Sequence, residues 1–215
     1  PIRSTGLPRS GFTRKFPHSV LYGPVGLQGL EVCNPFYFQY CRHVQDIVDQ
    51  TWRGTLTGKL LISNLEAVKL EAGLYGYLFD NPVEVTWFNT THSWVIETYK
   101  FCKTHNIVFE EPGAMVSPQC ENDRALMQMF ENHGYSVEEL CVLNRCRLYF
   151  QVTSVSDVVD GSGTQIPICW FRDFKLPTRK SNLQWPNQGK PTQANWVLWK
   201  AALRDCLIGS NLQIC

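Results

Sequence analysis

The stretch that decides the fold is Cys141-Val-Leu-Asn-Arg-Cys-Arg-Leu-Tyr-Phe-Gln-Val-Thr-Ser-Val-Ser-Asp-Val158. At about 3.6 residues per turn, apolar residues fall on nearly every side of the helix that it predicts. One face carries Val137, Leu140, Cys141, Leu148 and Val152, and most of the remainder is covered by Val142, Leu143, Cys146, Tyr149 and Phe150. A helix that is apolar nearly all round is a buried helix. We therefore expect this element to be the centre of the fold.

The start of this central helix is marked by Ser136 and by Glu139 three residues later. This spacing predicts a capping box, in which each side chain serves a backbone N–H group that would otherwise lack a partner. Asn144, Arg145, Arg147 and Gln151 are the polar residues within the stretch. Buried polar groups are costly without hydrogen bonds, so these four residues need partners inside the fold or on a ligand.

On both sides of the central helix, helical periodicity alternates with glycine and proline stops. We expect helices over 34–52, 57–72, about 89–106, 121–133 and 192–208. Residues 20–22 and 30–32 predict two short strands around a glycine-punctuated loop, whose spacing does not match a phosphate-binding motif. Residues 163–190 hold prolines and mixed charges without a period.

These elements predict a mainly α fold: a helical bundle with a small N-terminal β-hairpin and a long irregular segment before the last helix. Residues 1–16 read as a basic linker, and residues 17–215 as a single helical domain. Within that domain, 17–73 hold the hairpin and the first helix pair, and 74–215 form the helical remainder. The opening residue, Pro1, favours a segment of a longer reading frame.

Composition narrows the class of protein. The chain has 215 residues, 44% of them hydrophobic, and a net charge of +1. It therefore has enough apolar residues for a core, and no overall charge that favours nucleic acid or an anionic membrane. No stretch approaches eighteen uninterrupted apolar residues, the first residues given lack the apolar core that a signal peptide has, and the nine cysteines are scattered. These features predict an intracellular protein, cytoplasmic or nuclear, without a membrane partner.

The sequence predicts no catalytic, cofactor-binding or metal-binding residue. Its eight aspartates include no adjacent pair and no Tyr-x-Asp-Asp turn, so the chain lacks the clustered carboxylates that hold two metal ions in a polymerase. Cys33, Cys41 and His43 could contribute to a zinc site, but no second pair stands at ligand spacing. Cys141 or Cys146 would need a nearby histidine to act as a nucleophile.

The basic residues are the better candidates for a functional site. Contact with a phosphate backbone requires cations on one surface, interleaved with aromatic residues where bases are unstacked. The candidates are Arg14, Lys15, Arg53, Lys59, Arg145 and Arg147. The alternative is that the central arginines pair with acids inside the fold and that the others are simply solvated.

Three stretches together resemble one family. Phe16-Pro-His-Ser-Val-Leu-Tyr-Gly-Pro-Val-Gly-Leu-Gln-Gly-Leu-Glu-Val32 is similar to the sequence that follows the polymerase domain in retrotransposon-type reverse transcriptase proteins. Residues 121–123 with 143–157, and residues 185–189 with Trp196 and Trp199, resemble sequence farther downstream in the same proteins. The resemblance spans most of the chain. His18 and residues 29–32 depart from the family pattern, which fits a divergent or decayed copy.

The resemblance implies a non-catalytic C-terminal region of a retroelement reverse transcriptase, whose parent protein would be an RNA-directed DNA polymerase. The first helices would act like a polymerase thumb. The implied partners are RNA or an RNA–DNA duplex and the upstream polymerase domain of the same polypeptide, which would supply the metal ions. The competing interpretation is a helical scaffold or protein-interaction domain that does not bind nucleic acid.

Overall fold

A computed structural model describes residues 7–9, 11, 13, 15–80, 85–87, 93–111, 123–160, 165–171 and 185–208. Contacts divide the chain into two compact units, residues 1–46 and residues 47–215. The boundary falls inside one long helix.

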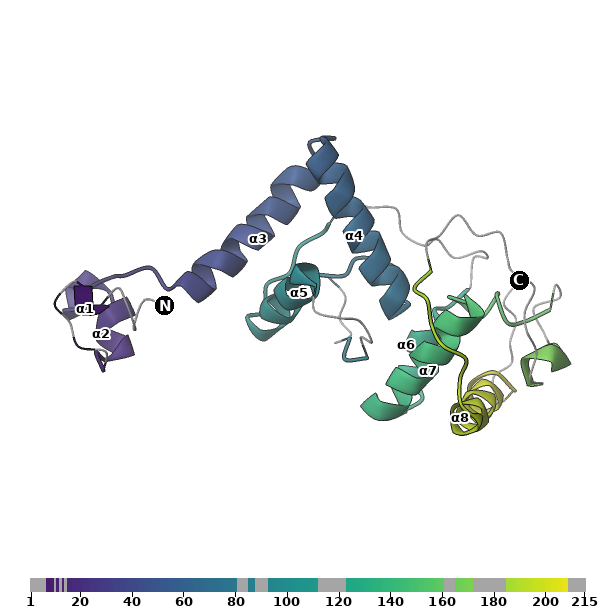
Figure 1. Ribbon diagram of the computed structural model, residues 1–215. Helices are drawn as coiled ribbons and strands as arrows, with labels where there is room; N and C mark the ends of the chain where they lie inside the picture. The colour runs from purple at the N-terminus through teal and green to yellow at the C-terminus, as the bar shows by residue number, and fades with distance from the viewer. Residues whose placement is uncertain are drawn as a thin grey trace. The chain divides into compact units, whose positions relative to one another are not determined.

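Helices supply the regular structure of the described residues (Figure 1). They are α1 (Leu7–Arg9), α2 (His18–Tyr22), the 3₁₀ helix η2 (Val25–Leu27), α3 (Pro35–Thr51), α4 (Leu56–Ala72), α5 (Trp94–Thr104), α6 (Leu126–Asn132), α7 (Val137–Phe150), the 3₁₀ helix η3 (Ile168–Phe171), α8 (Gln193–Leu203) and the π-helical segment η4 (Arg204–Ile208). The mainly α class predicted from the sequence is confirmed. Within the same residues, the β pairing is a single isolated bridge between Ala125 and Ser154.

In the first unit, the predicted β-hairpin is not confirmed. Residues 20–22, expected as its first strand, belong to helix α2. The returning segment donates from Leu30 N to Val20 O (2.8 Å), but Glu31 has a φ of +47°, which an extended strand does not allow. The short run of apolar residues at 20–22 suits a helix as well as a strand, so its pattern could not distinguish them.

The glycines of this first unit serve a close approach between backbone segments. A β-carbon at Gly29 would lie 2.0 Å from Gly23 O, far inside the contact distance of any real side chain. A residue with a side chain would therefore force the two segments apart. The glycine spacing that interrupts the predicted strands has a steric role at this turn.

In the second unit, helix α7 is the central element that the sequence predicts. Its capping box is formed as expected: Glu139 N donates to Ser136 Oγ (3.4 Å), and Ser136 N donates to Glu139 Oε2 (2.9 Å). The helix ends at Phe150, because Gln151 adopts the left-handed conformation with φ of +57°. The expectation that Val152 still belongs to the helix is wrong, since residues 151–158 form a turn held by local hydrogen bonds.

The core of the second unit is assembled on α7, which packs against α4, α6 and α8, while α4 also packs against α5. An aromatic cluster fills the space between α7 and α8. The ring of Phe150 lies 4.9 Å from Trp196 and 5.5 Å from both Trp170 and Trp199, measured between centroids. Phe130 of α6 joins the cluster through an edge contact with Trp199 at 5.9 Å. Aromatic pairs at such distances add stability beyond the area that they bury.

Among the residues that the structure describes, no helix is both long enough and apolar enough to span a membrane.

Candidate functional site

The six basic residues predicted from the sequence differ in where the structure places them. Arg14 lies outside the described residues. Lys15 is exposed in the first unit, and the other four belong to the second unit. Arg53, Lys59, Arg145 and Arg147 therefore belong to one compact unit.

Arg53 and Lys59 lie together at the turn between α3 and α4. Both are exposed, one in the connection and the other in the first turn of α4. The connection is tight: Thr55 caps α4 by accepting from Gly58 N at 3.1 Å. A β-carbon at Gly58 would lie 2.2 Å from Gln50 O, so the absence of a side chain lets the two helix ends meet.

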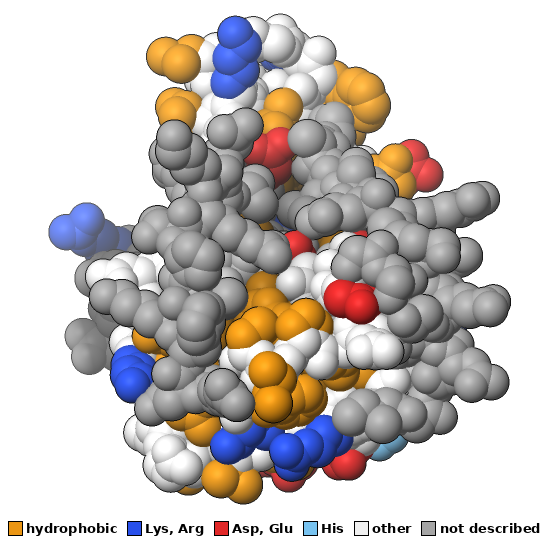
Figure 2. All heavy atoms as spheres, turned by 90° about the vertical axis from the view of Figure 1, so that its right-hand side faces the viewer, with side chains coloured by type: hydrophobic (Ala, Val, Ile, Leu, Met, Phe, Trp, Pro, Cys, Tyr) orange, Lys and Arg blue, Asp and Glu red, His pale blue; other side chains and the backbone are white. Residues whose placement is uncertain are grey.

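Trp52 is exposed at the same turn, with 71% of its surface accessible. The helix expected over 34–52 includes Trp52 as its last residue. Trp52 lies instead just beyond the last residue of α3, next to Arg53. Figure 2 shows, at the top where this turn lies, a Lys or Arg side chain with hydrophobic side chains around it.

Arg145 and Arg147 point in different directions, because residues two positions apart on a helix are rotated by about 200° around its axis. Arg145 is exposed, whereas Arg147 has 0% of its surface accessible. The prediction that Arg147 contacts a phosphate backbone at the surface is therefore wrong, because the residue is buried. Its charge is enclosed by the protein.

The guanidinium of Arg147 is bound to backbone oxygens at the C-terminal end of α4. Its Nη2 donates to Leu70 O and Glu71 O, both at 2.7 Å, and its Nη1 donates to Val152 O at 3.1 Å. Nε donates to Asn144 Oδ1 at 2.9 Å. The last carbonyls of a helix lack partners within the helix and carry partial negative charge, so a buried cation fits there.

The same helix end is completed by two other side chains. Asn144 Nδ2 donates to Glu71 O (2.9 Å), and Trp87 Nε1 donates to Ala72 O (2.8 Å). Burial lowers the pKa of Arg147, and electrostatic interactions with Glu71, Tyr75 and Asp157 act in the opposite direction. The partners that the sequence required for Asn144 and Arg147 are thus mainly backbone carbonyls and not acidic side chains. This network has a structural role.

Arg147 also fixes the separation between Arg145 and the α3–α4 turn. Lys59 and Leu70 are 70 − 59 = 11 residues apart on α4, or about 17 Å along the helix axis at about 1.5 Å per residue. Because Arg147 contacts Leu70, α7 lies against the end of α4 opposite to Lys59. Arg53 and Lys59 therefore both lie at the α3–α4 turn, whereas Arg145 belongs to a helix that packs at the other end of α4.

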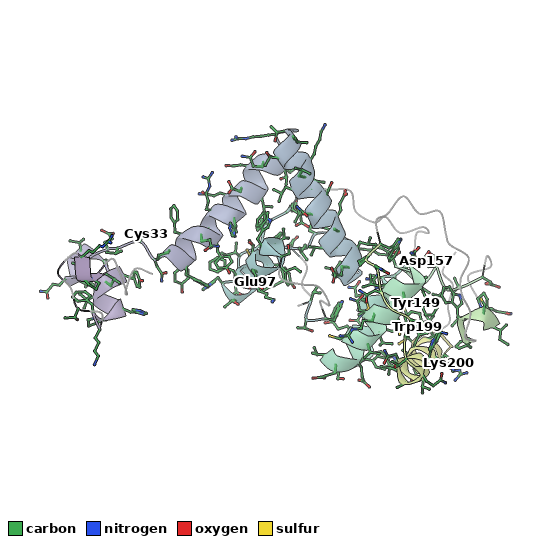
Figure 3. The ribbon with its side chains drawn as sticks, in the orientation of Figure 1. Cys33, Glu97, Tyr149, Asp157, Trp199 and Lys200 are labelled. Atoms are coloured by element: carbon green, nitrogen blue, oxygen red, sulfur yellow. The ribbon has the colours of Figure 1, made fainter. Side chains whose placement is uncertain are left out.

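A second polar cluster follows α7, next to the Arg147 network. Asp157 Oδ2 accepts from Thr153 N (2.7 Å) and Ser154 N (3.2 Å), and Asp123 accepts from Ser156 N (3.0 Å) and Ser156 Oγ (2.7 Å). Figure 3 labels Asp157 near the C-terminal end of α7. The hydrogen bonds of both carboxylates to neighbouring backbone and hydroxyl groups hold the turn in place.

The cysteines considered as nucleophiles have environments that disfavour a thiolate. Burial raises the pKa of the Cys146 thiol to about 12 and also raises the pKa of Cys141. A thiol with a raised pKa is a poor nucleophile at neutral pH. Within the described ranges, no group of three or more His, Cys, Asp or Glu residues is placed to hold a metal ion.

Comparisons with protein-family models, with curated proteins and with solved structures found no match to this chain. The functional proposal therefore depends on the geometry of the α3–α4 turn and on the resemblance carried by the sequence.

Proposed function

We propose that this chain is a non-catalytic C-terminal segment of a retroelement reverse transcriptase, and that it holds the template or the RNA–DNA duplex for an upstream polymerase domain. In this role the polymerase domain of the same polypeptide supplies the carboxylates and metal ions. The protein would work inside the cell, in the cytoplasm or the nucleus. The observation that carries the proposal is the exposed group Trp52, Arg53 and Lys59 at one helix–helix turn.

The chemistry of this turn suits a nucleic-acid backbone. Arg53 and Lys59 supply two cations from adjoining parts of a tight connection, and each could neutralise one phosphate. Trp52 offers a flat aromatic surface on which an unpaired base could stack. Arg145 would contribute at most a separate contact, and Arg147 none. The contact surface is therefore smaller than the one that the sequence predicts.

Binding of labelled RNA–DNA duplex and labelled single-stranded RNA, measured by fluorescence anisotropy over a range of salt concentrations, tests the proposal. Each lost phosphate contact should reduce the salt slope by about 0.9 on a duplex. The Arg53→Gln/Lys59→Gln double variant should therefore reduce the slope by about 1.8. The matched control is Lys100→Gln, since Lys100 is an exposed lysine of α5 in contact with Glu97 at 3.1 Å.

The role of Trp52 is tested separately on single-stranded RNA. Trp52→Ala should weaken binding by about 1–3 kcal/mol if a base stacks on the indole, and Trp52→Phe should retain part of the affinity. Equal salt slopes for the wild-type chain and the double variant would overturn the proposal. A sequence upstream of residue 1 that encodes no Tyr-x-Asp-Asp domain would remove the reverse transcriptase context while leaving the nucleic-acid test intact.

The second candidate is a helical scaffold or protein-interaction domain without nucleic-acid binding. The observation that favours it is the exposure of two leucines on α4 close to the same turn, Leu56 at 75% and Leu60 at 59%. Exposed apolar side chains that lie together are typical of protein contacts. Absence of any salt-dependent binding to RNA or duplex would favour this candidate over the first.

A further inference from the structure

A cleft of about 420 Å³ lies in the second unit, between α6 and η4. It is lined by Arg124, Gln128, Met129, Asn132, His133 and Cys206. Its volume falls in the range of about 300–1,000 Å³ that is usual for sites of small molecules. None of the six lining residues belongs to the basic set considered above, so this is a separate site.

One face of a single helix supplies most of the lining. Gln128, Met129, Asn132 and His133 recur at i, i+1, i+4 and i+5, which places them on the same side of α6 and its C-cap. The other side of α6 is buried through Leu126, Met127 and Phe130. The lining is therefore held by a helix whose opposite face is fixed in the core.

Arg124 enters the cleft from a backbone that is anchored on both sides. Its N–H donates to Asp123 Oδ1 (3.0 Å), and its carbonyl oxygen accepts from Val155 N (3.0 Å). The bridge between Ala125 and Ser154 follows directly. The side chain of Arg124 is exposed and forms no ion pair with another described residue. A rigid backbone thus presents a guanidinium whose charge is available to a ligand.

The opposite wall is joined to the end of α6 by a side-chain contact. Tyr135 Oη donates to Asp205 Oδ2 at 3.2 Å, which ties the segment after α6 to η4. This hydrogen bond engages the acid that adjoins Cys206. Burial raises the pKa of the Cys206 thiol to about 11, so Cys206 presents a neutral thiol on this wall at physiological pH.

The C-terminal carbonyls of α6 are also occupied. Met129 O accepts from His133 N (3.0 Å), Glu131 O accepts from Gly134 N (2.9 Å), and Phe130 O accepts from Tyr135 N (3.4 Å). The lining itself contains no aspartate or glutamate. Its polar groups are instead a guanidinium, two carboxamides and an imidazole, which can all donate hydrogen bonds.

We propose that this cleft binds the phosphate group of a small phosphorylated molecule. The planar fork of Arg124 would hold two phosphate oxygens, and the amides of Gln128 and Asn132 with the imidazole of His133 would donate to the remaining ones. The phosphate group of an ester has three terminal oxygens that accept hydrogen bonds, whereas a carboxylate has two. Four side chains that donate hydrogen bonds therefore suit a phosphate better than a carboxylate. The rest of the molecule would lie against Met129 and Cys206.

The test is a titration of the full ¹⁵N-labelled chain followed by NMR, with inorganic phosphate, with glycerol 3-phosphate and with sodium chloride at matched ionic strength. Saturating shifts of the Asn132 and His133 amide signals are expected with both phosphates and not with chloride. Arg124→Gln should weaken both phosphates at least tenfold. Preference for inorganic phosphate would identify the free ion as the ligand, and preference for the ester would identify an organic phosphate.

Two further variants make the outcome decisive. Asn132→Leu, at the exposed end of α6, should also weaken binding and serves if Arg124→Gln does not fold. Arg53→Gln/Lys59→Gln should bind both phosphates as the wild-type chain does, which separates this site from the proposed nucleic-acid contact. Shifts that are the same with chloride, or affinity unchanged by both cleft variants, would overturn the proposal. So would binding of an oligonucleotide without binding of either small phosphate.

Discussion

Gly73 passes so close to Arg147 that a β-carbon on Gly73 would lie 3.0 Å from the guanidinium carbon Cζ. The glycine ends α4 with a φ of +70°, and its N–H donates to Leu70 O and Lys69 O. The C-terminal end of α4 and the charged side chain of Arg147 on α7 are therefore close neighbours. Both residues should be sensitive to substitution, for different reasons.

Substitution of Arg147 should strongly destabilise the second unit. Arg147→Met keeps the aliphatic stem but leaves Val152 O and Asn144 Oδ1 without their donor. It also removes the two short hydrogen bonds to Leu70 O and Glu71 O, which then keep only their contacts with Gly73 N and Asn144 Nδ2. Each buried unsatisfied group costs about 1–3 kcal/mol, so we expect a loss of about 3 kcal/mol or more, or failure to fold. Urea unfolding followed by circular dichroism measures it. Arg145→Met is the control on the same helix, and because Arg145 is exposed its cost should stay within about 1 kcal/mol.

Gly73→Ala should cost more than Gly134→Ala, although both glycines have a positive φ. The φ values are +70° and +90°, so each alanine carries a backbone penalty of about 1–2 kcal/mol. At Gly73 the new β-carbon would also meet Met127 Cγ at 2.8 Å, whereas at Gly134 nothing lies within 4 Å. Overpacking should add about 1–3 kcal/mol at Gly73 alone. Equal losses in the midpoint of urea unfolding would contradict the steric part of this account.

Removal of the lysine from the buried ion pair of Lys69 and Glu111 should strongly destabilise the second unit. Lys69 Nζ lies 2.7 Å from Glu111 Oε1, and both side chains are almost fully enclosed. Glu111 also accepts hydrogen bonds from the N–H groups of Leu78 and Phe79. Lys69→Met should cost about 3–5 kcal/mol because it leaves a buried carboxylate without its cation.

The double variant Lys69→Met/Glu111→Leu shows whether the pair or the amide contacts matter more. Replacing both charges removes the unpaired carboxylate, but the amides of Leu78 and Phe79 then lose their acceptor. We therefore expect the double variant to recover only part of the stability that Lys69→Met loses. A double-mutant cycle from urea unfolding measures this coupling, and full recovery would show that the amide contacts contribute little.

The capping box of α7 should make stability depend on pH in the acid range. Hydrogen bonds from the backbone N–H and the hydroxyl of Ser136 lower the pKa of Glu139 below its ordinary value of 4.5. A carboxyl with a lowered pKa in the folded state contributes stability that is present above the unfolded pKa and lost as pH falls through the folded one. Glu139→Gln should therefore be less stable than the wild-type chain near neutral pH.

That difference should shrink as the pH falls below about 4.5, because a protonated Glu139 resembles glutamine. Thermal unfolding of the two chains across the acid range measures it. Glu138→Gln is the matched control, since Glu138 lies in the same first turn of α7 without closing the capping box. A difference that persists unchanged in acid would assign the effect of Glu139 to something other than its charge.

Much of the fold could be predicted because its signals are local. The capping box needs only residues 136 and 139, and the glycine stop of α4 needs only Gly73 at the end of an apolar period. The end of α7 at Phe150 could not be predicted from the sequence, because Gln151 adopts the left-handed conformation that glycine or asparagine usually adopts at a helix end. The apolar run at 20–22 is too short for periodicity to separate a helix from a strand.

The site could be predicted only in part, because a basic residue looks the same in sequence whether it is exposed or buried. Arg145 and Arg147 stand two positions apart, yet one is exposed and the other is enclosed. The exposure of Trp52 depends on where α3 ends, which periodicity resolves only to within a few residues. The cleft at Arg124 and Cys206 joins residues 82 positions apart (206 − 124) and left no signal in the sequence.

The sequence by itself determined that α7 is a largely apolar helix of the core and that Asn144 and Arg147 need partners there, because periodicity and the cost of unpaired polar groups act within one helix. The expectation that this helix is buried nearly all round is wrong, since Val137 and Arg145 are exposed. Only the tertiary structure decided that those partners are the last carbonyls of α4, more than seventy residues earlier. Free carbonyls occur at the end of every helix, so their chemistry is known in advance. Which helix end meets Arg147 depends on how the whole core packs, and no local pattern encodes it.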